Sequence, residues 1–367
     1  MKKTAAAPLL ALMGAATLSS AALAQSSVQL YGSVDAGVDY VSNAGGSRLN
    51  AVNSGRRSPD RFGFQGSEDL GGGLQAFFKL ESGLNLDTGT NTRPDVFFNR
   101  YSIIGVRSAT LGTVTAGHMP DFMYEYVSPT SNSVPGISSS FTPGNLDNLA
   151  NQFQMDNAIK YESPVMGGFQ FGAMNGFGES ALGFSTARKI GVGAQYRGSA
   201  LRVAAGYSMY HDRTADVRGI FDLSTLLGQN IAAGSLFTTT KFRTAGVGAS
   251  YAVGLFTPHV LVSDVNLANA NGNESLRHYE AGVNIDISGG SKVDLLGLSV
   301  ARSSFTTRHY QQINLFASHL FSKTVQVYAG LARVQADGPG ALAGLFGYTK
   351  STTDSQTLLR VGFQQQF

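Results

Sequence analysis

The clearest pattern in the chain is an alternation of apolar and polar positions close to its start. From Val28 to Tyr40 every second residue is apolar or glycine, and most residues between them are polar, including Asp35 and Asp39. A period of two places these two sets on opposite faces of a β-strand. The segment is about 13 residues long, roughly twice the usual strand of a soluble protein, which suits a tilted strand that crosses a bilayer.

The same alternation recurs along the chain. Its plainest repeats lie at residues 74–81, 189–197, 201–208 and 279–287. Short turns, such as 198–199 and 322–323, alternate with long polar connections, one of which we expect at Ser42–Pro59. This arrangement is typical of antiparallel strands that cross a membrane as a meander. Roughly sixteen strand candidates can be counted, a number that encloses an aqueous channel. The weakest are 255–265 and 293–302, and losing either with its partner would leave fourteen.

One long segment departs from this rhythm. Residues 98–117 predict two strands joined by a tight connection, but no period of 2 or 3.6 holds from His118 to Asn157, where four prolines interrupt any regular element. A structureless stretch of about 40 residues is uncommon in a compact domain and usually indicates disorder or function. We expect residues 118–157 to fold into the lumen of the barrel as a constriction loop.

The amino terminus has the pattern of an export signal. Lys2 and Lys3 precede an apolar run that ends in Ala22-Leu23-Ala24, a small-residue cleavage pattern, so residues 1–24 are predicted to be a signal peptide and 25–367 the barrel domain. Loss of the two lysines lowers the formal net charge from +3 to +1. The chain has no cysteine, which excludes a disulfide framework.

Several functional classes find little support. No basic run or patch offers a footprint for nucleic acid. Glycine pairs such as Gly191/Gly193 and Gly246/Gly248 lack the helix and spacing of a dinucleotide site, and we interpret them as strand glycines that ease curvature. Asp35 and Asp39 are about 13 Å apart along one strand face, too far for a glycosidase pair. Neither a zinc-protease motif nor a nucleophile elbow occurs, so we expect no enzyme, no catalytic residue, no metal and no cofactor.

The carboxy-terminal strand, Leu359–Phe367, ends on an aromatic residue, which resembles the signal by which outer-membrane barrels are recognised for assembly. Phe367 is therefore a candidate assembly residue. With this feature the chain resembles the general diffusion porins of Gram-negative outer membranes, in particular the trimeric porins of betaproteobacteria. The segments that carry the likeness are Ser27–Gly37, Arg61–Leu74, Phe77–Gly83, Phe98–Arg100 and Leu111–Gly117. Two departures are Gln365, where a larger apolar residue is more common, and the absence of tryptophan.

The resemblance implies a transmembrane antiparallel β-barrel of about 16 strands that assembles as a homotrimer in outer-membrane lipid. It implies a water-filled channel for small ions and hydrophilic solutes. Two alternatives stay open: a substrate-specific channel with a binding site, and a barrel whose extracellular loops serve adhesion.

In such a channel the chemistry is electrostatic. Arg61 and Arg100 lie about 7 and 8 residues before their short turns, which places both roughly 16 to 19 Å above the short-turn rim. We expect them to form the basic side of the constriction and to give the pore a mild preference for anions. Lys160 matches a basic position of the family and is a further candidate. Asp121 and Glu125 form the acidic side of the constriction or fasten the loop by hydrogen bonds.

Overall fold

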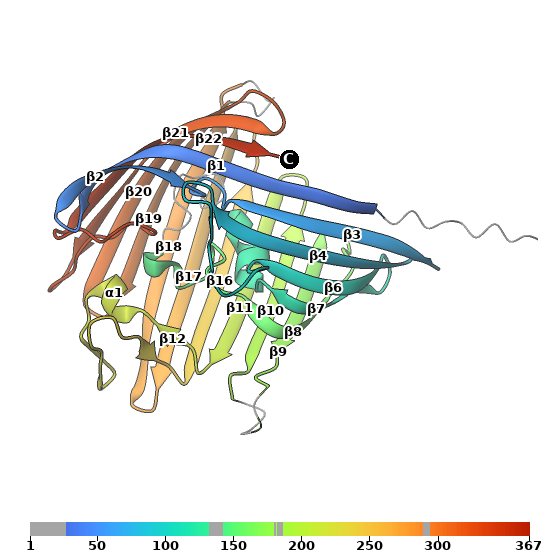
Figure 1. Cartoon of the computed structure of the whole chain (residues 1–367), viewed down its shortest axis with the longest axis horizontal. Coiled ribbons are helices and arrows are strands. Elements are labelled where there is room, and N and C mark those ends of the chain that lie inside the picture. The colour runs from blue at the N-terminus through green and yellow to red at the C-terminus, as the bar shows by residue number, and fades with distance from the viewer. Residues whose placement is uncertain (1–26, 132–141, 180, 182–185, 289–293) are drawn as a thin grey trace, which may run out of the picture.

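The computed structural model describes residues 27–131, 142–179, 181, 186–288 and 294–367. The predicted signal peptide, residues 1–24, lies outside this range. Within it, the chain is almost entirely β-sheet, wound into a barrel (Figure 1). Among the described residues, no helix is long and apolar enough to cross a membrane.

The barrel wall is made of consecutive antiparallel neighbours. Its strands are β1 (Ser27–Ala44), β2 (Ser47–Ser54), β3 (Arg61–Gly71), β4 (Leu74–Asn85), β6 (Tyr101–Ser108), β7 (Gly112–Met119), β8 (Met155–Glu162), β9 (Phe169–Gly176), β10 (Lys189–Arg197), β11 (Leu201–His211), β16 (Lys241–Tyr251), β17 (Phe256–Asn269), β18 (Gly272–Asp286), β19 (Asp294–Phe305), β20 (Arg308–Leu320), β21 (Val325–Asp337) and β22 (Ser355–Gln366). The last strand, β22, pairs with β1 from Ser33↔Gln366 to Val41↔Leu358, which closes the barrel.

β2 and β3 occupy one position in the wall, because both pair with the same edge of β1. The described chain therefore forms a closed barrel of 16 strands, as the alternation predicts. Both of the weakest strand predictions are confirmed, as β17 and β19. The expectation of a polar connection over Ser42–Pro59 is wrong for most of that stretch. A tight turn at Gly45-Gly46 returns the chain as β2, and only residues 55–60 leave the wall.

The two rims of the barrel differ. We call the end with the connections 72–73, 109–111 and 198–200 the short-turn rim, and the opposite end the long-loop rim. The long-loop rim carries the long segments 86–100, 120–154, 212–240 and 338–354. Its connections at 45–46, 270–271 and 306–307 are tight turns, so the predicted strict alternation of short and long connections is only partly correct.

The small elements belong to these long-loop connections. They are β5 (Thr90–Asn91), η1 (Met123–Val127), η2 (Ser128–Thr130), η3 (Pro143–Asn145), β12 (Thr214–Ala215), α1 (Val217–Phe221), β13 (Thr225–Leu226), β14 (Gln229–Asn230) and β15 (Phe237–Thr238). Figure 1 shows α1 and β12 gathered at one rim of the barrel.

The exposure of the wall residues is inverted relative to a soluble protein. On β1 the side chains of Val28 and Val38 are 67% and 62% exposed, whereas Asp35 and Asp39 are fully buried. Apolar residues thus face outward and polar residues face the lumen, which is the pattern of a barrel whose outer surface meets lipid. Buried apolar residues gather instead where the loop after β7 and the connections 212–240 and 338–354 meet the wall.

Candidate functional site

The described parts of the loop after β7, residues 120–131 and 142–154, lie inside the barrel. The loop spans residues 120–154, slightly shorter than the predicted 118–157, because β7 continues to Met119 and β8 begins at Met155. Its helical turns η1 and η2 pack against β11 and β16. Phe122 and Met123 are fully buried in this contact. The predicted lumenal loop is therefore confirmed, and it contains short helical turns that its proline-rich sequence does not suggest.

Glycines in the wall let the loop approach closely. A Cβ added at Gly193 would stand 2.6 Å from Cγ of Phe122, and one at Gly246 would stand 2.7 Å from Cε of Met123. Both distances are far below van der Waals contact. At Gly193 the close atoms are Cβ and Cγ of Phe122, which cannot move without the loop backbone, so a side chain there would displace the loop; at Gly246 the close atom is the flexible end of Met123. These glycines, expected to ease strand curvature, thus also form a seat for the loop after β7.

Asp121 fastens the loop to the wall. Its carboxylate accepts hydrogen bonds from the Tyr210 hydroxyl at 2.9 Å, the Asn148 side-chain amide at 3.0 Å and the Tyr124 backbone N–H at 3.2 Å. The side chain is fully buried, and this burial raises the pKa of Asp121. Of the two roles open to Asp121 in the sequence, the geometry favours fastening the loop.

Arg61 and Arg100 meet around one carboxylate. Nε of Arg100 lies 2.6 Å from Oε1 of Glu81, while Nε of Arg61 lies 3.9 Å and Nζ of Lys79 lies 3.5 Å from Oε2. The Tyr31 hydroxyl also donates to Glu81, at 2.8 Å. We call Arg61, Lys79, Arg100 and Glu81 the basic cluster. It holds three cations and one carboxylate, and β4 contributes both Lys79 and Glu81, neither of which the sequence singled out.

A second charged group lies beside the loop. Nζ of Lys160 is 2.6 Å from Glu125 and 3.2 Å from Glu162, and the Tyr101 hydroxyl donates to Glu125 at 3.3 Å. Burial raises the pKa of Glu125, against the opposing effect of Lys160. We call Lys160, Glu125 and Glu162 the acidic group; it holds one cation and two carboxylates. The acidic group and the basic cluster together contain four cations and three carboxylates.

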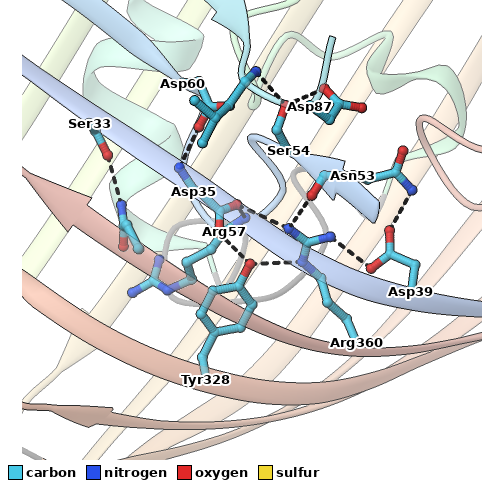
Figure 2. Close-up of polar contacts among 12 residues, drawn as sticks. Ser33, Asp35, Asp39, Asn53, Ser54, Arg57, Asp60, Asp87, Tyr328 and Arg360 are labelled. Atoms are coloured by element: carbon cyan, nitrogen blue, oxygen red, sulfur yellow. Dashed lines mark hydrogen bonds and ion pairs between the residues drawn. The ribbon is translucent and has the colours of Figure 1, made fainter. Parts of the chain in front are cut away.

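A third polar network holds residues 55–60 inside the lumen. Arg360 is fully buried, with Nη1 2.7 Å from Asp39 and Nη2 3.4 Å from Asp35, and its Nε donates to the Tyr328 hydroxyl at 2.7 Å. Figure 2 shows the carboxylates of Asp35 and Asp39 on either side of this guanidinium, at the seam between β1 and β22.

The same network anchors the inward segment, residues 55–60, through the Arg57 backbone and the Asp60 side chain. The Arg57 N–H donates to Asp35 at 2.8 Å, and the Asp35 N–H donates to Asp60 at 2.6 Å (Figure 2). These hydrogen bonds hold the inward segment against β1 beside Asp35, whose side chain is fully buried. No local sequence pattern predicts this feature, because Arg360 and its partners on β1 are more than 300 residues apart.

The carboxy-terminal residue closes the seam at the short-turn end. Phe367 exchanges two backbone hydrogen bonds with Gly32, of 2.9 and 3.1 Å, and its ring is 54% exposed on the outer face. A Cβ at Gly32 would stand 2.4 Å from this ring, so the aromatic side chain covers the glycine. Elsewhere, within the residues that the structure describes, no cluster of three His, Cys, Asp or Glu residues could hold a metal ion.

Comparisons with known proteins agree with this architecture. Residues 6–339 match the model of the Gram-negative porin family. Outer membrane porin protein 32 of Delftia acidovorans is 30% identical over 366 residues, which cover 95% of this chain and 96% of that protein. An outer membrane porin protein of Bordetella pertussis is 32% identical over 251 residues, 60% of this chain and 63% of that protein.

Solved structures show the same fold. The anion-selective porin from Comamonas acidovorans superposes with a TM-score of 0.77 at 24% identity, over 94% of this chain and all of that one. OmpT of Vibrio cholerae, solved in a trimer form, superposes with a TM-score of 0.65 at 16% identity, over 93% of this chain and 99% of that one. The chain therefore belongs to the Gram-negative porin family and is a protein of the outer membrane.

Proposed function

We propose that the chain forms a water-filled channel for small ions and hydrophilic solutes, with a mild preference for anions set at the constriction. The observation that carries this proposal is the charge of the two groups beside the loop. Together they hold four cations and three carboxylates, and three of the cations converge on the single carboxylate of Glu81. The Comamonas relative, described as anion-selective, has the same fold.

Arg61 is better placed than Arg100 or Lys160 to act on a passing ion. Its side chain is 26% exposed and its guanidinium lies 3.9 Å from Glu81, whereas Arg100 is buried against the same carboxylate at 2.6 Å. A charge that keeps contact with water and has only a distant partner exerts the larger field on the lumen. Lys160 is more fully compensated, because two carboxylates flank it.

The test is the reversal potential under a KCl gradient in a planar bilayer. Wild type should favour chloride, and the Arg61→Ser/Arg100→Ser double variant should be neutral or favour potassium. The difference should shrink as the salt concentration rises, because the Debye length falls from about 10 Å at 0.1 M to about 3 Å at 1 M. An unchanged reversal potential in the double variant would remove these arginines from the mechanism.

The same recording separates the alternatives. A substrate-specific channel would be blocked by a low concentration of one solute, and an adhesive barrel would conduct little. Three further parts of the proposal are carried by sequence and family: cleavage of residues 1–24, assembly as a homotrimer, and absence of enzymatic activity. Intact-mass measurement on outer-membrane material tests the first, with Gln25 as the expected amino terminus.

A further inference from the structure

Three arginines near the long-loop rim differ from those of the basic cluster. Arg56 lies on the inward segment, Arg93 on the connection between β4 and β6, and Arg213 on the connection after β11. Within the described part of the chain, no carboxylate lies within 4 Å of any of the three guanidinium groups. Their positive charges are therefore not neutralised by direct contact there.

Arg56 and Arg93 are held by backbone carbonyl groups. Nη2 of Arg56 donates to the carbonyl oxygen of Gly347 at 2.7 Å, and its guanidinium lies 4.5 Å from the ring centroid of Tyr348. Nη2 of Arg93 donates to the carbonyl oxygen of Gln152 at 2.6 Å. A carbonyl group fixes the orientation of a guanidinium but leaves its full charge in place.

Arg213 rests on aromatic rings. Its guanidinium lies 3.7 Å from the ring centroid of Phe153 and 5.2 Å from that of Phe242. Its Nε is buried without a hydrogen-bond partner among the described residues, as is Nε of Arg56. Burial lowers the pKa of Arg213, and the nearby charge of Arg93 acts in the same direction. An arginine nevertheless stays protonated at neutral pH, so these groups offer unused donors and an unbalanced charge.

The three side chains line two adjoining cavities. Arg56 and Arg93 line a cavity of about 430 Å³ that reaches Arg100 of the basic cluster. Arg213 lines a cavity of about 330 Å³. Residues Gln152 and Phe346 belong to the lining of both. Arg93 and Arg213 belong to connections of the long-loop rim, so both cavities lie toward that end of the barrel.

The carboxylates that line these cavities accept hydrogen bonds from other groups of the protein. Asp60 accepts backbone N–H groups, Asp87 accepts the Ser54 hydroxyl at 2.8 Å, and Asp216 accepts the Gly219 N–H at the start of α1. The cavities also contain two further cations, Arg100 and Lys350, whose carboxylate partners, Glu81 and Asp222, do not line them. Cations therefore outnumber carboxylates in the combined lining.

We propose that Arg56, Arg93 and Arg213 form an anion-binding station in the outer vestibule, which holds small polyvalent oxyanions such as phosphate or short dicarboxylates in preference to chloride. The proposal rests on the proposed channel function. Guanidinium groups present paired donors that match two oxygens of a carboxylate or phosphate, whereas chloride offers a single centre. Two or more arginines around one cavity also favour a ligand with two charges over a ligand with one.

The test is block of the chloride current by inorganic phosphate at pH 8 and, separately, by succinate. In wild type, millimolar concentrations of each should reduce the single-channel current. In the Arg56→Gln/Arg93→Gln/Arg213→Gln variant, the half-blocking concentration should rise at least tenfold. The preference for chloride over potassium should persist in that variant, because Arg61, Lys79 and Arg100 are intact.

Two further variants complete the experiment. A control replaces three outward-facing, exposed arginines, Arg277, Arg302 and Arg333, by glutamine and should be blocked like wild type. Replacement of the station arginines by lysine keeps the charge without the paired donors, and should weaken phosphate block by a smaller factor than glutamine does. The heat-resistant form on electrophoresis reports assembly of each barrel.

The outcomes separate the two proposals. If the glutamine variant is blocked like wild type while chloride preference remains, the station is wrong and the proposed function stands. If wild type shows no anion preference, the proposed function fails. In that case the station is still supported if phosphate or succinate blocks wild type and the arginine-to-lysine and control variants but not the glutamine variant of the station. Block by phosphate alone, or by succinate alone, would identify which oxyanion the station takes.

Discussion

Replacing Glu81 by glutamine should make the channel more selective for anions. Among the described residues, Glu81 is the only carboxylate that contacts the three cations of the basic cluster, and it is buried. Glutamine has nearly the same shape and keeps an oxygen that can accept from Arg100 Nε and the Tyr31 hydroxyl. The substitution therefore removes one negative charge while it preserves most of the hydrogen bonds.

The size of the effect follows from Coulomb's law. A unit charge changes the energy of a monovalent ion about 6 Å away by roughly 0.7 kcal/mol at the dielectric constant of water. That energy corresponds to a factor of about 3 in occupancy, upward for anions and downward for cations. The permeability ratio should therefore rise by up to about tenfold at low salt. Near 1 M salt, where the Debye length is about 3 Å, most of this increase should vanish.

The assay is the reversal potential under a KCl gradient, with Glu68→Gln as control. Glu68 lies on β3 near the short-turn rim, is exposed, and carries the same charge change away from the constriction. Loss of the carboxylate also leaves Arg100 buried beside two other cations, so the heat-resistant barrel should unfold at a lower temperature. An equal shift in both variants, or no shift in Glu81→Gln, would refute the role assigned to the cluster.

Three further predictions address the loop, the seam and the pH response. Gly246→Val should displace Met123 from its seat and lower the single-channel conductance; conductance equal to wild type would show that the seat does not set the width. Deletion of Phe367 should reduce the yield of assembled barrel by a large factor and leave the conductance of assembled channels unchanged; a normal yield would contradict its role at the seam. Burial raises the pKa of Glu125, so acidification should neutralise this carboxylate at a higher pH than an ordinary glutamate and increase the preference for anions. The Glu125→Gln variant should show the increased anion preference already at pH 7, and its permeability ratio should depend less on pH.

The strand pattern was predictable because a barrel in lipid imposes a local rule. Along β1 the period of two alone separates Val38, which faces outward, from Asp39, which faces the lumen. The rule failed over β2, where Asn50 and Asn53 make the strand polar enough to resemble a connection. That segment becomes a strand because β1 offers it an unpaired edge, which is a tertiary effect.

The candidate site was predictable only in part. Sequence spacing placed Arg61 and Arg100 at one height, and the structure brings both to Glu81, but no local pattern indicates which carboxylate they share. No local pattern singles out Arg360, because its partners on β1 lie at the other end of the chain. Contacts of this kind depend on closure of the barrel, which a single sequence does not reveal.

The central claim is that local charge at the constriction, and not the net charge of the protein, sets the selectivity of the pore. The most direct measurement is the chloride-to-potassium permeability ratio of the wild-type channel, obtained from reversal potentials at low and high salt. We predict a ratio above one at about 0.1 M KCl that approaches the ratio of free solution near 1 M, because screening shortens the reach of Arg61 and its neighbours. A ratio at or below one at low salt, or a preference that does not change with salt, would contradict the account.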